Sequence, residues 1–107
     1  MATTATQTDP RVLAQITEYI TAGLERGIKM EINTIGNWCR EVTFYEWSNH
    51  SMQWRKRMWV SVYTSSSNRL NVEAQWFGGD AGRVNKRDIL DQISWIELND
   101  SLQNLVR

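Results

Sequence analysis

The spacing of apolar residues near the start of the chain predicts a helix. Five of these residues recur at helical intervals and form one stripe: Val12, Leu13, Ile16, Ile20 and Leu24. Asp9 and Pro10 precede the stripe as an N-cap carboxylate and a proline at the first helical position. Gly27 suits the left-handed residue that follows a helix end. We therefore expect a helix that begins after Asp9 and ends before Gly27.

Segments with the character of strands follow this helix. Residues 28–33 alternate between apolar and polar side chains, which is typical of a strand buried on one face. Residues 38–47 are rich in β-branched and aromatic side chains, and residues 57–64 and 69–77 are predicted as two further strands. The connections between these segments are short and polar. Because parallel pairs need long crossovers, such connections favour antiparallel pairing.

A second helix is predicted near the C-terminus. Asn85, with Asp88 three residues later, resembles a capped helix start, and apolar residues keep helical spacing from Ile89 to Leu105. The Asn-Asp-Ser sequence at residues 99–101 leaves this helix either continuous or broken in two. The expected fold class is therefore α+β, with a helix, a four-stranded antiparallel meander and a C-terminal helix. Both helices are expected to pack on one face of the sheet.

Alternation along the predicted strands divides the sheet into two unlike faces. One face is almost wholly apolar and matches two amphipathic helices: Val42, Phe44, Met58, Val60, Val62, Leu70, Val72, Ala74 and Trp76. The other face mixes aromatic with polar and charged side chains: Thr43, Tyr45, Trp47, Arg57, Trp59, Ser61, Tyr63, Asn71, Glu73, Gln75 and Phe77. A bulge of one residue would exchange the two faces beyond it.

The mixed face is the candidate binding surface. Its aromatic rings suit the apolar side chains of a partner, and the expected anchors are Tyr45, Trp47, Arg57, Trp59 and Tyr63. Two other interpretations stay open, namely burial of this face in a homodimer and aromatic pairing that only stabilises the sheet. An unidentified protein partner is the leading expectation, and a homodimer is compatible with it.

Length, composition and charge bound the class of protein. The chain has 107 residues, 41% of them apolar and 22% charged, which suits one globular domain and is too short for two. Residues 1–8 hold no apolar residue larger than alanine after the initiator Met, so we expect a flexible tail there and a single domain at residues 9–107. The net charge of zero removes the simplest argument for nucleic-acid binding. One cysteine, with no signal-peptide or membrane-span pattern, favours a reducing, cytoplasmic location.

One local run of charge nevertheless suits nucleic acid. Three consecutive cations lie between tryptophans, a pattern that combines phosphate contact with base stacking: Trp54, Arg55, Lys56, Arg57 and Trp59. The alternative is a hairpin edge that carries cations to stay soluble and to avoid pairing with other edges. Because the domain as a whole is neutral, the solvated edge is the favoured interpretation.

No pattern in the chain indicates catalysis, a cofactor or a metal site. Cys39 and His50 are the only residues of their types, and the strand between them separates them too far for a nucleophilic pair. The glycine-rich residues 78–83 lack the features of a Walker loop or a dinucleotide fingerprint, which favours a plain connection. Acidic residues show no metal-ligand spacing. We therefore predict a non-enzymatic intracellular protein-binding domain, an inhibitor or an assembly subunit, with single-stranded nucleic-acid binding as the alternative.

Overall fold

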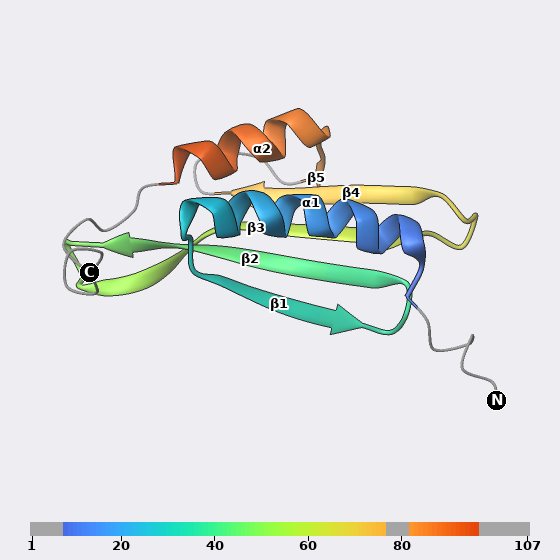
Figure 1. Ribbon diagram of the computed structural model, residues 1–107, viewed down its shortest axis with the longest axis horizontal. Coiled ribbons are helices and arrows are strands. Elements are labelled where there is room, and N and C mark those ends of the chain that lie inside the picture. The colour runs from blue at the N-terminus through green and yellow to red at the C-terminus, as the bar shows by residue number, and fades with distance from the viewer. Residues whose placement is uncertain (1–7, 77–81, 97–107) are drawn as a thin grey trace.

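The computed structural model describes residues 8–76 and 82–96, which have an α+β fold (Figure 1). The predicted helix, antiparallel meander and second helix are all present, and a two-residue strand extends the sheet. The elements in chain order are α1 (Pro10–Arg26), β1 (Met30–Ile35), β2 (Cys39–Ser48), β3 (Gln53–Thr64), β4 (Leu70–Trp76), β5 (Gly82–Arg83) and α2 (Lys86–Trp95). The predicted break at residues 99–101, most of the predicted tail and Phe77 lie outside the described residues.

The caps of both helices are those that the sequence predicts. Asp9 Oδ1 accepts a hydrogen bond from the backbone N–H of Arg11 at 2.9 Å, and Gly27 ends α1 with a left-handed φ of 73°. Asn85 Oδ1 accepts from the backbone N–H of Asp88, also at 2.9 Å. Each side chain satisfies an N–H group that has no partner within its helix, which fixes where the helix begins.

The strands form one antiparallel sheet in the order β1-β2-β3-β4-β5. β3 begins at Gln53, four residues before the predicted start at residue 57, and pairs with β2 as far as Ser48. The β2–β3 hairpin therefore projects past the ends of both helices (Figure 1). We call the end of this hairpin, residues 46–56, the hairpin tip.

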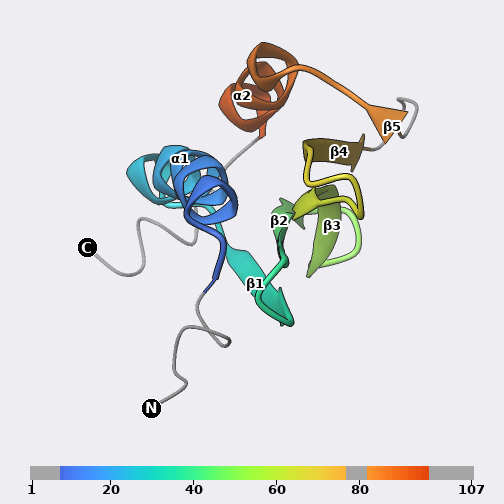
Figure 2. The same ribbon diagram turned by 90° about the vertical axis from the view of Figure 1, so that its right-hand side faces the viewer.

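Both helices lie on the same side of the sheet (Figure 2). The face predicted to be apolar is the one that they cover, and its central residues Val42, Val60 and Val62 are fully buried. These residues join a core with side chains from the two helices: Val12, Ile16, Tyr19, Ile89 and Ile93. The opposite side of the sheet carries no helix within the described residues.

Two sequence predictions about burial are wrong. The buried line of α1 consists of Val12, Ile16, Tyr19 and Gly23, whereas Leu13 and Leu24 are 44% and 64% exposed. At about 100° per residue, Leu13, Ile20 and Leu24 lie roughly a quarter-turn away from the buried line. Ile32, which the alternation in residues 28–33 assigns to a buried face, is 55% exposed because β1 is the edge strand.

Candidate functional site

The side of the sheet opposite the helices is the candidate site. The strand registers place a single set of side chains on it, and we call this surface the open face. Its members are Glu31, Asn33 and Ile35 of β1; Cys39, Glu41, Thr43, Tyr45 and Trp47 of β2; Trp54, Lys56, Trp59, Ser61 and Tyr63 of β3; and Asn71, Glu73 and Gln75 of β4. Four of the five predicted anchors lie on it, and Arg57 does not.

Aromatic rings occupy the whole length of the open face. At the hairpin tip, Trp47 and Trp54 meet edge to face across β2 and β3, with ring centroids 5.3 Å apart and an interplanar angle of 76°. At the other end, Trp38 and Tyr63 meet at 6.4 Å and 88°. The half-buried Trp59 lies between these two pairs. Trp38, which the sequence left without a role, thus extends the aromatic row.

Neighbouring side chains already satisfy the polar atoms of three of these rings. The Tyr45 hydroxyl donates to Glu31 Oε1 at 3.0 Å, the Tyr63 hydroxyl donates to Glu73 Oε2, and Trp47 Nε1 donates to Asn49 Oδ1 at 3.0 Å. Accepting this bond, the Glu31 carboxylate raises the pKa of Tyr45 above its usual value, so the phenol stays neutral. The rings are held in place, and what they offer to solvent is mainly apolar ring surface.

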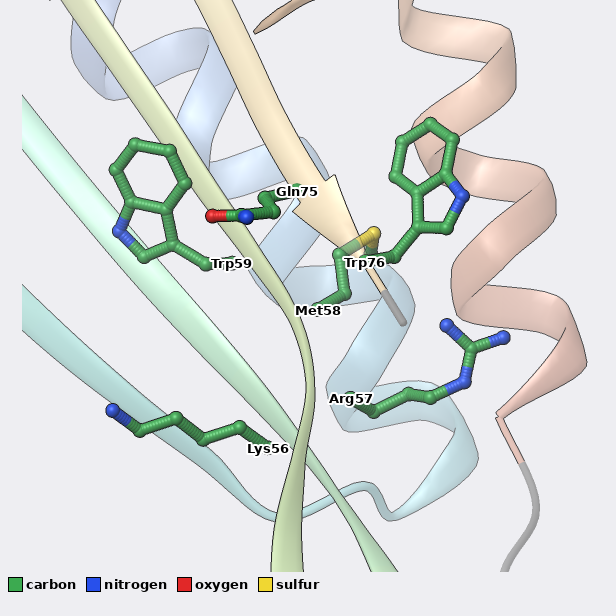
Figure 3. A pocket seen from close by; sticks show the side chains of 6 residues that line it. All are labelled: Lys56, Arg57, Met58, Trp59, Gln75 and Trp76. Atoms are coloured by element: carbon green, nitrogen blue, oxygen red, sulfur yellow. The ribbon is translucent and has the colours of Figure 1, made fainter. Parts of the chain in front are cut away.

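A bulge at Arg57 explains why this residue is missing from the open face. Phe44 pairs with Met58, but the next residue, Tyr45, pairs with Lys56, so Arg57 is the extra residue of β3. The side-chain alternation reverses at this point. Figure 3 shows the Arg57 guanidinium directed toward α2, whereas Lys56 points to the other side of the strand.

The contacts of Arg57 tie the sheet to the second helix. Arg57 Nη2 donates to Gln92 Oε1 of α2 at 3.0 Å, and Arg57 Nε lies 3.8 Å from the carboxylate of Glu46. The Arg57 side chain is only 16% exposed. The prediction that Arg57 shares a face with Tyr45 and Trp59 is therefore wrong, and the geometry gives this arginine a structural position.

The same bulge divides the cationic run. Lys56 and Trp54 lie on the open face with Trp59, whereas Arg55 and Arg57 lie on the side of the helices. The predicted sequence of three cations between tryptophans therefore does not form one continuous surface. Two hollows adjoin the divided run: one of about 200 Å³ where β4 ends beside the bulge (Figure 3), and one of about 490 Å³ at the hairpin tip that includes His50.

Charge on the open face is separated along the strands. Lys29 lies just before β1, and its Nζ is 5.8 Å and 5.6 Å from the ring centroids of Tyr45 and Trp54. Because Lys56 pairs with Tyr45 from the other side, two lysines flank one tyrosine near the tip. Among the described residues, neither lysine forms an ion pair. The middle of the face is acidic instead, with Glu31, Glu41 and Glu73.

Nothing in the described residues assembles catalytic groups. Burial raises the pKa of the Cys39 thiol, which is 3% exposed and contacts Ser61 Oγ at 3.5 Å, so the thiolate is disfavoured. His50 lies in the hairpin loop at the far end of β2. Over residues 8–76 and 82–96, no three His, Cys, Asp or Glu side chains gather as metal ligands. Neither α1 nor α2 combines the length and the apolarity that crossing a bilayer requires.

Sequence reasoning missed Lys29, Glu31 and Trp38 on this surface. The alternation in residues 28–33 could have placed Lys29 and Glu31, because they occupy the same alternate positions as Asn33 and so lie on the same side of the strand. Trp38 has no such signal, because it precedes β2 and takes its place through contact with Tyr63. Comparison of the chain with protein-family models, curated proteins and solved structures finds no match.

Proposed function

We propose that the chain is a non-enzymatic protein-binding domain, an inhibitor or an assembly subunit, that binds its partner through the open face. The observation that carries this proposal is a row of aromatic rings, on the side of the sheet opposite the two described helices, three of which already have their polar atoms satisfied. Tyrosine and tryptophan held in this way contribute large contact area at a low cost in conformational entropy. A face of this kind binds by shape and by apolar contact.

The charges of the open face favour a protein over a nucleic acid. A single strand carries a continuous row of phosphates, and along this face it would pass Glu31, Glu41 and Glu73. Arg55 and Arg57 lie on the other side of the sheet and do not offset that repulsion. The alternative of single-stranded nucleic-acid binding is therefore the weaker proposal.

The charges of the open face also indicate the chemistry of the partner's surface. An acidic side chain of the partner would reach Lys29 and Lys56, which flank Tyr45 near the hairpin tip. Apolar side chains would cover Trp54 and Trp59, and neutral or basic groups would face the acidic middle. Opposite charges at two positions along one axis also fix the direction in which the partner lies.

The test compares two tryptophans on opposite sides of the sheet. Trp59→Ala removes an aromatic ring from the open face, and Trp95→Ala removes an equally large ring that is 62% exposed on α2. Proteins captured from the native host by the tagged wild-type chain are identified, and the direct affinity of each purified candidate is then measured. We expect W59A to weaken that affinity at least tenfold and W95A to leave it within twofold, with both variants folded by circular dichroism.

Two results would contradict the proposal. One is equal loss of affinity in the two variants, because binding would then not depend on the open face. The other is a salt-dependent change in tryptophan fluorescence on titration with single-stranded oligonucleotides, abolished by Lys56→Ala, which would favour the nucleic-acid alternative.

A further inference from the structure

The outer edge of β1 is a strand edge without a partner among the described residues. The backbone N–H of Tyr45 donates to the carbonyl of Lys29 at 2.9 Å, which sets the phase of the β1–β2 ladder. Because hydrogen-bonded pairs alternate along an antiparallel ladder, the odd-numbered residues of β1 direct their backbone groups toward β2. The backbone groups of Met30, Ile32 and Thr34 therefore point outward, away from the sheet.

The edge of β1 lacks most of the features that keep strand edges apart. It contains no proline and no bulge, and no lysine side chain lies within Met30–Ile35. Its central residue, Ile32, is 55% exposed on the side of the helices. An exposed, regular edge with an apolar residue at its centre is a template for pairing with another strand.

The flank of α1 above this edge is apolar too. The opposite flank of α1 contacts α2, through Glu18 to Lys86 at 3.2 Å and through Arg26 to the carbonyl of Ile93. Leu13, Ile20 and Leu24 lie on the flank away from those contacts, which is the flank on the side of β1. With Ile32 they form an apolar strip along one border of the molecule, and three of its four members are exposed.

We propose that β1 pairs with β1 of a second copy of this chain, antiparallel, about a two-fold axis at Ile32. In this register Ile32 faces Ile32 of the partner copy, and Met30 faces Thr34 of the partner copy. Every outward N–H and C=O of these three residues then has a hydrogen-bond partner. The two apolar strips line one groove above the joined strands.

The side chains of β1 favour a second copy over an unrelated strand. An axis at Ile32 places Glu31 opposite Asn33 of the other copy and Lys29 opposite Ile35, so no like charges meet. The strand is therefore complementary to a second copy of itself in the register that places Ile32 on the two-fold axis. Pairing of this kind is isologous and closes at two copies, because each chain offers a single β1 edge.

The dimer is independent of the proposed function but bears on it. Joining the β1 edges continues the sheet across the axis, which brings two open faces onto one side of a single longer sheet. Such a dimer would offer a partner two copies of the aromatic row in a fixed relation. A monomeric chain with an active open face, or a dimer that binds no partner, would separate the two proposals.

Mass in solution is the first test. By light scattering on the full chain we expect a species of twice 12.5 kDa, shifting toward monomer on dilution. Ile32→Lys puts a charge at the axis and is expected to raise the dimer dissociation constant at least tenfold. Met52→Lys, at a residue 69% exposed in the hairpin tip, is the matched control and should leave the dissociation constant unchanged.

Cross-linking tests the register. In a Cys39→Ser background, Ile32→Cys should join two copies through a short bis-maleimide or by oxidation, because residues opposite each other lie about 5.5 Å apart. Thr34→Cys should not, because Thr34 is two residues from the axis and its copies are separated by roughly 14 Å. A wild-type monomer at all concentrations, a dimer unaffected by I32K, or equal cross-linking of the two cysteine variants would each overturn the proposal.

Discussion

Trp47 and Trp54 meet edge to face across the β2–β3 hairpin, in the tip of a hairpin that projects past the ends of both helices. The two residues are a directly opposed pair in the ladder, and Lys29 lies over the Trp54 ring. The tip of the hairpin therefore depends on its own side chains, because the core ends before it. This pair both stabilises the hairpin and forms one end of the open face.

We predict a measurable coupling between the two rings. In a double-mutant cycle, Trp47→Ala and Trp54→Ala should each lower the free energy of unfolding, with an interaction energy of about 0.5–1.5 kcal/mol between them. Urea denaturation followed by circular dichroism measures all four chains. Additive losses would mean that the rings contribute only through separate contacts with the strands.

Arg57 is expected to affect stability and to leave partner binding unchanged. The substitution Arg57→Met removes the hydrogen bond to Gln92 and the ionic contact with Glu46. It should lower the free energy of unfolding by about 1–3 kcal/mol. Lys56→Met, at the exposed neighbour, should change it by less than about 0.5 kcal/mol. An unchanged denaturation midpoint in R57M would show that the link to α2 carries no stability.

The substitution Gly23→Ala is predicted to destabilise the chain, although replacing glycine by alanine usually stabilises a helix. A Cβ at this position would lie 2.7 Å from Met30 Sδ and 2.8 Å from Phe44 Cε1, and the Phe44 ring is fully buried. The overlap should outweigh the gain in helix propensity, so that Gly23→Ala destabilises by about 1–2 kcal/mol. Adding Met30→Ala should restore part of the loss. A G23A chain more stable than wild type would mean that the helix moves away from β2 at little cost.

Tyr19 should produce a loss of stability at alkaline pH. Burial raises the pKa of its hydroxyl to about 12, whereas in the unfolded chain that pKa is about 10.0. The folded state therefore holds this proton more tightly, so its contribution to stability is complete below pH 10 and is lost as the pH rises toward 12.

The matched variant is Tyr19→Phe. Because neither Tyr19 Oη nor the adjacent Gln15 Nε2 makes a hydrogen bond of normal geometry among the described residues, removing the hydroxyl should leave stability at pH 7 unchanged or raise it by up to about 1 kcal/mol. Denaturation midpoints measured from pH 7 to pH 12 should fall less steeply in Y19F than in wild type. Parallel curves would contradict the assignment of this effect to Tyr19.

The sequence predicts most of the fold because its signals are local. Asp9, Gly27 and Asn85 act through hydrogen bonds or backbone angles within a few residues of themselves, and each lies where it was expected. The apolar face of the sheet is likewise a matter of alternation along each strand. Such features can be predicted without knowing the tertiary contacts.

The errors arise where tertiary contacts decide. Leu13 and Leu24 fit a helical stripe, but the position of α1 on the sheet selects the line through Ile16 and Tyr19 for burial. The face of the sheet on which the Arg57 side chain lies depends on a bulge, and no single residue in β3 indicates that bulge. Alternation places Trp59 and Tyr63 correctly because both follow the bulge, where they alternate without interruption with the buried residues of β3.

The bulge decides which side chains of the hairpin tip reach the open face, and composition does not reveal this. If β3 kept all its residues but ran without the bulge, Arg57 would pair with Tyr45, and every side chain between it and the turn would change sides. Arg55 would then lie opposite Trp47, and Trp54 would turn toward the helices. A homologous chain without the residue at position 57 would need no bulge and would keep the same tip, because Lys56 would pair with Tyr45 as it does now.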